Sequence, residues 1–181
     1  MKSSSRKLNV GCGKDILIGF TNLDLVKAEG VDVVHNLNKF PYPFKNNQFN
    51  EIIAKHIIEH LDEPEKFMEE LWRISEPGGK IYIRTPHYSC GSLSWGDLTH
   101  KRTFSRLAMH NYDVANKALN LKSLATDSKM RFKVNSRLIF GAVHRRIGIS
   151  LFANKFISFY ESMLSGLFPA REIIFYLEAV K

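Results

Sequence analysis

The sequence has few cysteines and no long apolar run. Cys12 and Cys90 are the only cysteines among 181 residues, too few for the disulfide framework of a small secreted domain. The best candidate for a membrane span, residues 147–167, is interrupted by Lys155 and Glu161. The polar residues 1–7 lack the apolar segment of a signal peptide. We therefore expect a reduced, cytoplasmic protein without a transmembrane segment.

Repeats, low-complexity linkers and compact zinc motifs are also missing. His87, Asp97 and His100 could together supply two nitrogens and one oxygen to a cation, but their spacing fits no zinc motif, so we expect no metal. A chain of this length, 44% apolar, is long enough to bury the core of one ordinary domain. We expect a single domain, with a cofactor-binding core in residues 1–85 and a substrate-facing extension in residues 86–181.

Acidic residues are scarce in the second half of the chain. Up to Thr85, 12 Lys and Arg balance 12 Asp and Glu, whereas 14 basic residues face only 6 acidic ones afterwards, which gives the net charge of +8. Such a surface suits an anionic partner, such as RNA, a phosphorylated sugar or an anionic membrane, or it serves solubility alone. The basic residues concerned are Lys101, Arg102, Arg106, Lys117, Lys122, Lys129, Arg131, Lys133, Arg137, Arg145 and Arg146.

A glycine turn follows the first apolar segment. Residues 8–10 predict a short strand, Gly11 and Gly13 follow it, and a second strand ends near Asp24 about ten residues later. Glycines at such a turn allow the backbone to approach a ligand closely, and a carboxylate at the second strand accepts hydrogen bonds from ribose hydroxyls. The spacing indicates a nucleoside-containing cofactor.

Further motifs follow in a fixed order. They are Asn36-Leu37, residues 40–44 leading into 48–53, Ile58-Glu59-His60-Leu61, and Pro77-Gly78-Gly79 leading into 80–83. The whole pattern resembles the class I S-adenosylmethionine-dependent methyltransferases. The resemblance implies S-adenosylmethionine as cofactor, held by Gly11, Cys12, Gly13, Asp24, Leu25, Asn36, Leu37 and His56.

Three asparagines depart from that family's pattern. Asn9, Asn36 and Asn50 stand where acidic residues are common, and an amide accepts a hydrogen bond without adding negative charge. These departures leave room for a second class of function, a binding or scaffold protein that keeps the fold and has lost the reaction.

The expected fold is α/β, a Rossmann-like open sheet that is mostly parallel. Strands are predicted over 8–10, 22–26, 31–35, 50–56 and 80–85, with an antiparallel hairpin of 131–140 and 173–180 at the C-terminal end. A helix is predicted over 64–75, with Asp62 as its cap and the Pro77-Gly78-Gly79 turn behind it. The links between the first three strands are too short for full crossover helices, so we expect shortened first helices. A thinly covered sheet edge would then leave room for a homodimer contact or for the C-terminal segment.

An apolar stripe at helical spacing runs from Leu151 to Leu167. It is either the core of a connecting helix or a lid, a dimer face or a peripheral membrane contact, since Arg145 and Arg146 precede it.

The loop after Pro86 carries the catalytic candidates. His87 or His100, oriented by Asp97, could act as general base, or these residues could only hold the loop together. The resemblance predicts methyl transfer to an oxygen or nitrogen of an unidentified acceptor, for which an anionic molecule is one option. An RNA methyltransferase is the alternative enzyme.

Overall fold

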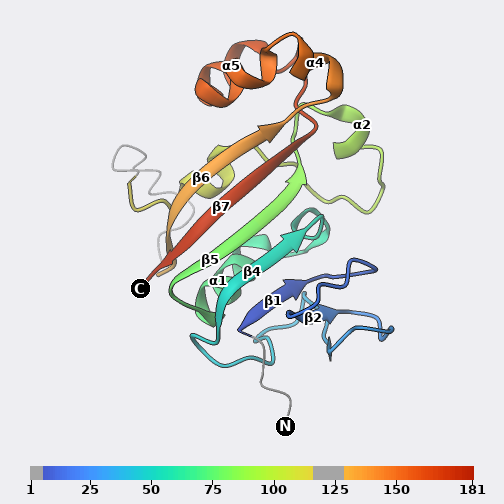
Figure 1. Cartoon of the computed structure of the whole chain (residues 1–181), viewed down its shortest axis with the longest axis vertical. Helices are drawn as coiled ribbons and strands as arrows, with labels where there is room; N and C mark the ends of the chain where they lie inside the picture. The colour runs from blue at the N-terminus through green and yellow to red at the C-terminus, as the bar shows by residue number, and fades with distance from the viewer. Residues whose placement is uncertain (1–5, 116–128) are drawn as a thin grey trace.

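The computed structural model describes residues 6–115 and 129–181, and its strands form one seven-stranded sheet (Figure 1). The strand order is β3-β2-β1-β4-β5-β7-β6. The strands are β1 (Lys7–Val10), β2 (Thr21–Asp24), β3 (Val33–Val34), β4 (Phe49–Lys55), β5 (Ser75–Pro86), β6 (Arg131–Ile139) and β7 (Glu172–Val180).

The sheet is parallel except for β7. Strand β1 pairs in parallel with β2 and β4, and β4 pairs in parallel with β5. Strand β7 lies antiparallel between β5 and β6, with Arg131 opposite Val180 and Ile139 opposite Glu172. The predicted α/β fold, an open and mostly parallel sheet with a C-terminal antiparallel hairpin, is confirmed. Because the parallel strands end at the same edge, that edge is where ligands bind in such sheets.

Turns replace the first crossover helices, as the short spacings predict. The chain between β1 and β2, and between β2 and β3, is described throughout and contains no helix. Buried Asn9 holds the first of these loops, because its Nδ2 donates to the Asp15 carbonyl at 2.7 Å and to Asn22 Oδ1 at 3.0 Å. The amide of Leu17 donates to the same Asn22 oxygen at 3.0 Å. A carboxylate at position 9 could not donate these hydrogen bonds. The asparagine side chain therefore stabilises the loop between β1 and β2.

Helix α1 (Pro64–Ile74) packs on β5 from the far side of the sheet in Figure 1. Its buried side chains recur at helical spacing, and proline suits its first turn because the missing N–H has no intrahelical partner there. On the same helix, Trp72 Nε1 donates to the Val180 carbonyl at 2.9 Å and ties the helix to β7. The buried residues of α1 are Phe67, Met68, Glu70, Leu71 and Ile74.

The expected cap at the start of α1 is wrong. The N-cap is Glu63, without a side-chain cap bond, and Asp62 instead pairs with Lys101. The turn expected at Pro77-Gly78-Gly79 is present, with a φ of 76° at Gly78, but it lies inside the span of β5, which begins directly at Ser75. The register of β4 against β5 shifts between Phe49 and Glu51. The two glycines lie in the extra residues of β5 at this bulge.

The C-terminal helices form what we call the helical cap, residues 142–164, at the top of Figure 1. It comprises α4 (Ala142–Arg146), α5 (Ile149–Lys155), α6 (Ile157–Phe159) and η2 (Tyr160–Leu164). Tyr160 is fully buried, but most of the apolar stripe is exposed, with Leu151 at 80% and Met163 at 66%. The interpretation of this stripe as ordinary core is therefore wrong. No helix of the described residues is long and apolar enough to cross a membrane.

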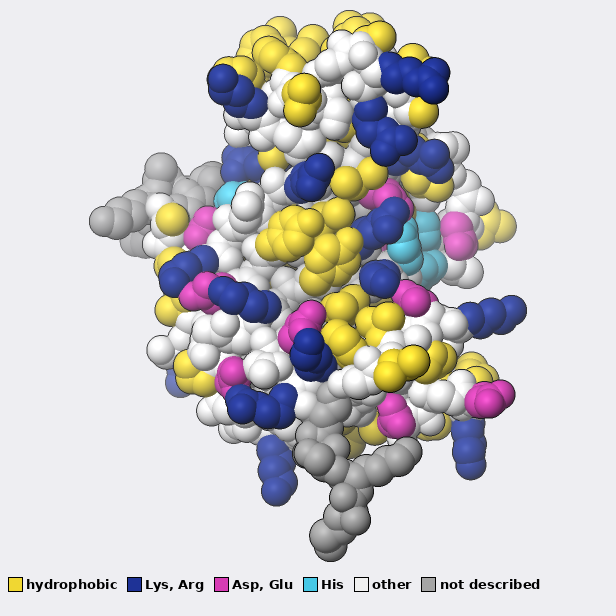
Figure 2. Space-filling view, in the orientation of Figure 1, with side chains coloured by type: hydrophobic (Ala, Val, Ile, Leu, Met, Phe, Trp, Pro, Cys, Tyr) yellow, Lys and Arg dark blue, Asp and Glu magenta, His cyan; other side chains and the backbone are white. Residues whose placement is uncertain are grey.

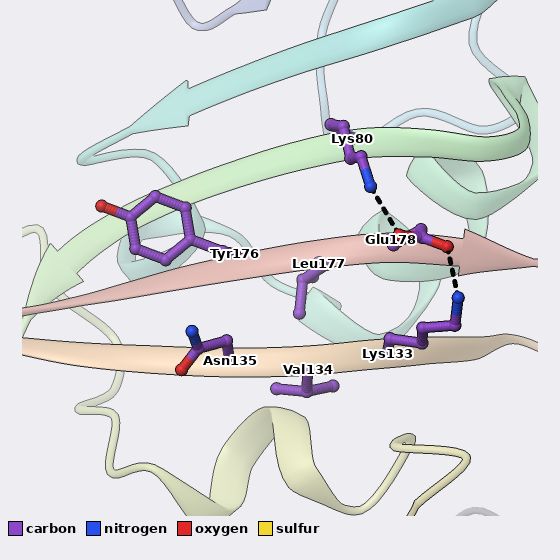
Figure 3. Close-up of a pocket in the computed structure, with 7 residues that line it drawn as sticks. All are labelled: Lys80, Lys133, Val134, Asn135, Tyr176, Leu177 and Glu178. Carbon is purple, nitrogen blue, oxygen red and sulfur yellow. Dashed lines mark hydrogen bonds and ion pairs between the residues drawn. The ribbon is translucent and has the colours of Figure 1, made fainter. Parts of the chain in front are cut away.

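The sheet face toward the viewer in Figure 1 is partly open. Hydrophobic side chains gather over β5 and β7 in Figure 2, and Tyr82 and Tyr176 pack edge to face there, with ring centroids 5.6 Å apart. Beside them, Glu178 of β7 reaches Lys80 on one neighbouring strand and Lys133 on the other (Figure 3). This ion-pair bridge fastens β7 to both neighbours.

Candidate cofactor and acceptor site

The glycine turn lies directly after β1, with positive φ angles of 63° at Gly11 and 51° at Gly13. A Cβ atom at Gly11 would lie 2.5 Å from Ile57 Cδ1, which excludes any larger residue without displacing Ile57. A Cβ atom at Gly13 would meet nothing within 4 Å. The turn is therefore closed toward Ile57 at its first glycine and open at its second, where a ligand can approach the backbone.

The Asp24 carboxylate, at the end of β2, borders this open side of the turn. Its Oδ2 accepts the Gly13 amide at 2.7 Å, and its Oδ1 accepts the Val26 amide at 3.2 Å. An ionised carboxylate has about four acceptor positions, so two remain for hydroxyl groups of a ligand. Gly13 and Asp24 thus lie together, as the sequence spacing predicts, and the exposed side chain of Leu25 follows directly.

The third predicted segment follows β3. The His35 amide donates to the Asp24 carbonyl at 2.9 Å, which places the chain beyond β3 next to the end of β2. Asn36 Oδ1 accepts the Asn38 amide at 2.9 Å and so stabilises a tight turn. Leu37 is buried, and its carbonyl accepts Tyr42 Oη at 2.9 Å. These contacts fix the backbone of the turn in place.

Cys12 is buried inside the glycine turn. Burial and the nearby Asp24 carboxylate raise the pKa of its thiol. Because a nucleophilic cysteine needs a lowered pKa, Cys12 contributes shape to the turn.

His56 follows β4 in an unusual backbone conformation. Its φ of 51° is uncommon for a residue other than glycine, and the fold holds it by a 2.8 Å bond from its amide to the Arg84 carbonyl. The ring, 43% exposed, lies between two carboxylates, with Nδ1 3.4 Å from Glu59 and Nε2 3.1 Å from Glu172. The contact with Glu59, reinforced by the charges of Glu59 and Glu172, raises the pKa of His56. We call His56, Glu59, Arg84 and Glu172 the acceptor cluster.

The other members of the acceptor cluster are tied to the sheet. Arg84 of β5 pairs with Glu172, the first residue of β7, at 2.5 Å. Glu59 is buried, and its Oε2 accepts Thr85 Oγ1 at 3.0 Å. Glu59 belongs to a motif visible in the sequence, whereas Glu172 stands one residue before the last predicted strand and carries no other signal.

His87 is fully buried at the end of β5. Its Nδ1 lies 2.8 Å from Ser89 Oγ and its Nε2 lies 3.1 Å from Glu161 Oε1, which also accepts the Arg106 amide at 2.8 Å. The structure therefore joins His87 to Glu161 of the helical cap, while Asp97 lies beside another histidine.

That other histidine is His100, whose Nε2 lies 3.9 Å from Asp97 Oδ2. Its ring meets the ring of His60 edge to face, with centroids 4.7 Å apart. His60 belongs to η1 (Ile58–His60), and His100 follows α2 (Gly91–Ser94) in the loop between α2 and α3 (Leu107–His110). Figure 2 shows histidine side chains gathered with acidic and basic ones on one flank of the molecule. The three predicted catalytic residues thus fall into two separate groups.

The family described as the methyltransferase domain matches residues 1–131, which include the glycine turn, Asp24 and β1 to β5. The chain belongs to the methyltransferase domain family. The resemblance to class I S-adenosylmethionine-dependent methyltransferases that the motifs predict is confirmed. No curated protein matches the chain.

Solved methyltransferases share this fold at low sequence identity. An S-adenosylmethionine-dependent methyltransferase from Archaeoglobus fulgidus is 16% identical with a TM-score of 0.64, over 98% of this chain and 87% of that one. One from Thermotoga maritima is 17% identical with a TM-score of 0.54, over 100% and 84%. Phosphoethanolamine N-methyltransferase 2 of Haemonchus contortus, solved with S-adenosyl-L-methionine, is 14% identical with a TM-score of 0.54, over 99% and 49%.

Proposed function

We propose that this protein transfers a methyl group from S-adenosylmethionine to an oxygen or nitrogen atom of an acceptor bound at the acceptor cluster. One observation carries the proposal: the open side of the glycine turn at Gly13 faces the Asp24 carboxylate, while the closed side at Gly11 contacts Ile57, the neighbour of His56. This arrangement supports two adjoining sites, one for each reactant, at the carboxyl edge of the sheet.

The residues around the turn fit S-adenosylmethionine. The space at Gly13 leaves room for the ligand beside the backbone, and the free acceptor positions of Asp24 suit the two ribose hydroxyls. Leu25, Asn36 and Leu37 would flank the adenine, with Cys12 beneath the turn. We keep Gly11, Cys12, Gly13, Asp24, Leu25, Asn36 and Leu37 as the proposed cofactor residues, and His56 as the residue at the boundary with the acceptor.

When bound, S-adenosylmethionine supplies an electrophilic methyl group, so the protein mainly aligns the acceptor and excludes water. The strained backbone of His56 directs its ring toward the acceptor side, and Glu172 and Arg84 fix that ring from β7 and β5. His100 suits a direct contact with the acceptor better than His87 does, because both ring nitrogens of His87 are occupied and the side chain is fully buried. Asp97 would accompany His100.

The deciding experiment is calorimetric titration with S-adenosylmethionine and S-adenosylhomocysteine, using the wild type, Asp24→Ala and a surface control, Glu63→Gln. Charged hydrogen bonds contribute about 1.5–3 kcal/mol each, so Asp24→Ala should weaken binding roughly 10- to 150-fold while the control binds normally. If neither ligand binds the wild type, the protein is a scaffold that keeps the fold without the reaction.

The RNA alternative is tested on the same protein. Two of the basic residues that motivate it, Lys117 and Lys122, lie outside the described residues. Others are paired with carboxylates, as Lys101 is with Asp62 and Lys133 with Glu178. RNA binding that weakens steeply with salt would favour an RNA acceptor, and a flat response would exclude it.

A further inference from the structure

We propose that Glu59, His60 and His100 bind a divalent transition-metal cation such as zinc, at a site that shares Glu59 with the acceptor cluster. One ligand atom from each residue lies within 4.8 Å of the other two. Glu59 and His60 come from η1, and His100 comes from the loop beyond α2. Two imidazole nitrogens and one carboxylate oxygen suit zinc and its neighbours better than calcium or magnesium.

The hydrogen bonds of both histidines leave Nε2 available for a metal. His60 Nδ1 lies 3.3 Å from the Thr99 carbonyl and 2.9 Å from Thr99 Oγ1, and His100 Nδ1 lies 3.2 Å from the Ser94 carbonyl. A carbonyl oxygen only accepts hydrogen bonds, so each Nδ1 carries the hydrogen and each Nε2 carries the lone pair. Metal-ligating histidines are usually oriented by such a bond from the opposite ring nitrogen.

Glu59 provides an independent observation. Its side chain is 1% exposed, and among the described residues its Oε1 accepts no hydrogen bond, although it forms an ion-pair contact of 3.4 Å with His56 Nδ1. Its Oε2 is held by Thr85. Leaving a charged oxygen buried without a hydrogen bond is costly, and a cation at this point would satisfy it.

The ligand atoms all lie within 4.8 Å of one another, close to the spacing of a loaded site. Zinc bonds of about 2.0–2.2 Å place tetrahedral ligand atoms roughly 3.3–3.6 Å apart, a spacing that small side-chain rotations can reach. Three protein ligands leave one position open, which an oxygen of the acceptor or the nearby Asp97 carboxylate can take. In that arrangement His100 acts as a ligand.

The test uses protein without a histidine tag, treated with a chelator and titrated with zinc. We expect one zinc per chain and a raised melting temperature, with affinity reduced on the order of 100-fold in His100→Gln and Glu59→Gln. His144→Gln, a histidine of the helical cap, should bind like the wild type. Absence of zinc binding, or equal affinity in all variants, would overturn the proposal. His100→Gln alone suffices if Glu59→Gln fails to fold, and unchanged S-adenosylhomocysteine binding in these variants separates this result from the methyl-transfer proposal.

A second observation concerns the helical cap, which we infer docks on an anionic lipid surface. Large apolar side chains are exposed along it and just beyond its end, while Arg145, Arg146 and Lys155 are exposed among them. Figure 2 shows both kinds of side chain at the top of the molecule. The exposed apolar residues are Val143, Ile147, Leu151, Phe152, Phe156, Phe159, Met163 and Leu167.

The charge of the helical cap favours a lipid surface over a second copy of the chain as its partner. Glu161 is the only acidic residue from 142 to 168, and it is turned inward onto His87 and the Arg106 amide. The outer surface of the cap is therefore apolar and positive, and a twofold contact between copies would bring like charges together. Anionic headgroups attract the arginines while the acyl region receives the apolar side chains.

Sedimentation with phosphatidylcholine vesicles, with and without phosphatidylglycerol, tests this inference. We expect binding to the anionic vesicles only, weakened about fivefold by each of Arg145→Gln and Arg146→Gln and strongly by the double variant L151S/M163S. Leu98→Ser, at an even more exposed leucine outside the cap, should bind like the wild type. No vesicle binding, or a dimer in solution that L151S/M163S dissociates, would overturn it.

Discussion

Asn9 Nδ2 lies 3.0 Å from Asn22 Oδ1, and both side chains are buried between β1 and β2. Asn22 also accepts the Leu17 amide and donates to the Leu17 carbonyl, so the two amides hold the loop that stands in place of a crossover helix. The asparagine at position 9, a departure from the family pattern, is thus explained by the shortened loop.

Asn9→Asp should destabilise the protein. A carboxylate at position 9 loses both donated bonds and faces the Asp15 carbonyl and Asn22 Oδ1, which costs about 2–4 kcal/mol in the free energy of unfolding. Urea unfolding measures the change. Asn47→Asp is the matched control, because Asn47 Oδ1 accepts from Lys181 and a carboxylate keeps that bond.

Gly11→Ala and Gly13→Ala should differ although both glycines have positive φ. Each alanine carries the backbone cost of about 1–2 kcal/mol. The Gly11 variant must also displace Ile57, which adds about 1–3 kcal/mol. Equal unfolding free energies for the two variants would contradict the close contact with Ile57.

Glu161→Ala should destabilise more than Glu161→Gln. The alanine leaves His87 Nε2 and the Arg106 amide without their acceptor, at about 1–3 kcal/mol for each. Glutamine keeps an acceptor oxygen and should change stability by less than about 1 kcal/mol. Thermal unfolding of both variants shows whether the contact between His87 and the helical cap holds the cap in place.

Glu178 should make stability depend on acid pH. Hydrogen bonds from Lys133 and Lys80 lower the pKa of Glu178 from 4.5 to about 2. Because the folded state favours the ionised form, the stabilisation is complete above about pH 4.5 and is lost as the pH falls toward 2. Glu178→Gln should flatten unfolding free energy against pH in that window. At about 1 M salt the difference should shrink, since the pair is exposed and screened.

The sequence was sufficient for the elements whose signals are local. The apolar spacing from Phe67 to Ile74 predicts α1 to within one residue, and the alternation after Arg131 predicts β6. Short spacings between the first strands also predict the missing helices correctly. Asp62 shows the limit of such signals, because its partner Lys101 lies far along the chain.

The site was predictable where its residues follow successive strands. Gly13 and Asp24 meet because parallel neighbours end at one edge, and that follows from strand order. The acidic partners of His87 and His56 could not be predicted from the order of the parallel strands. Glu161 comes from the helical cap, and Glu172 comes from the antiparallel strand β7. Sequence spacing does not show which carboxylates a late segment brings back to the sheet.

Glu172 opens β7, which follows the other six strands of the sheet in the chain, yet its carboxylate is the one that joins Arg84 to His56. During synthesis the glycine turn and Asp24 can therefore assemble early, while His56 waits for its second carboxylate. A nascent chain that ends before residue 172 has the cofactor edge without the finished neighbouring cluster. The order of synthesis thus delays the completed arrangement around His56 until the start of β7 has been made.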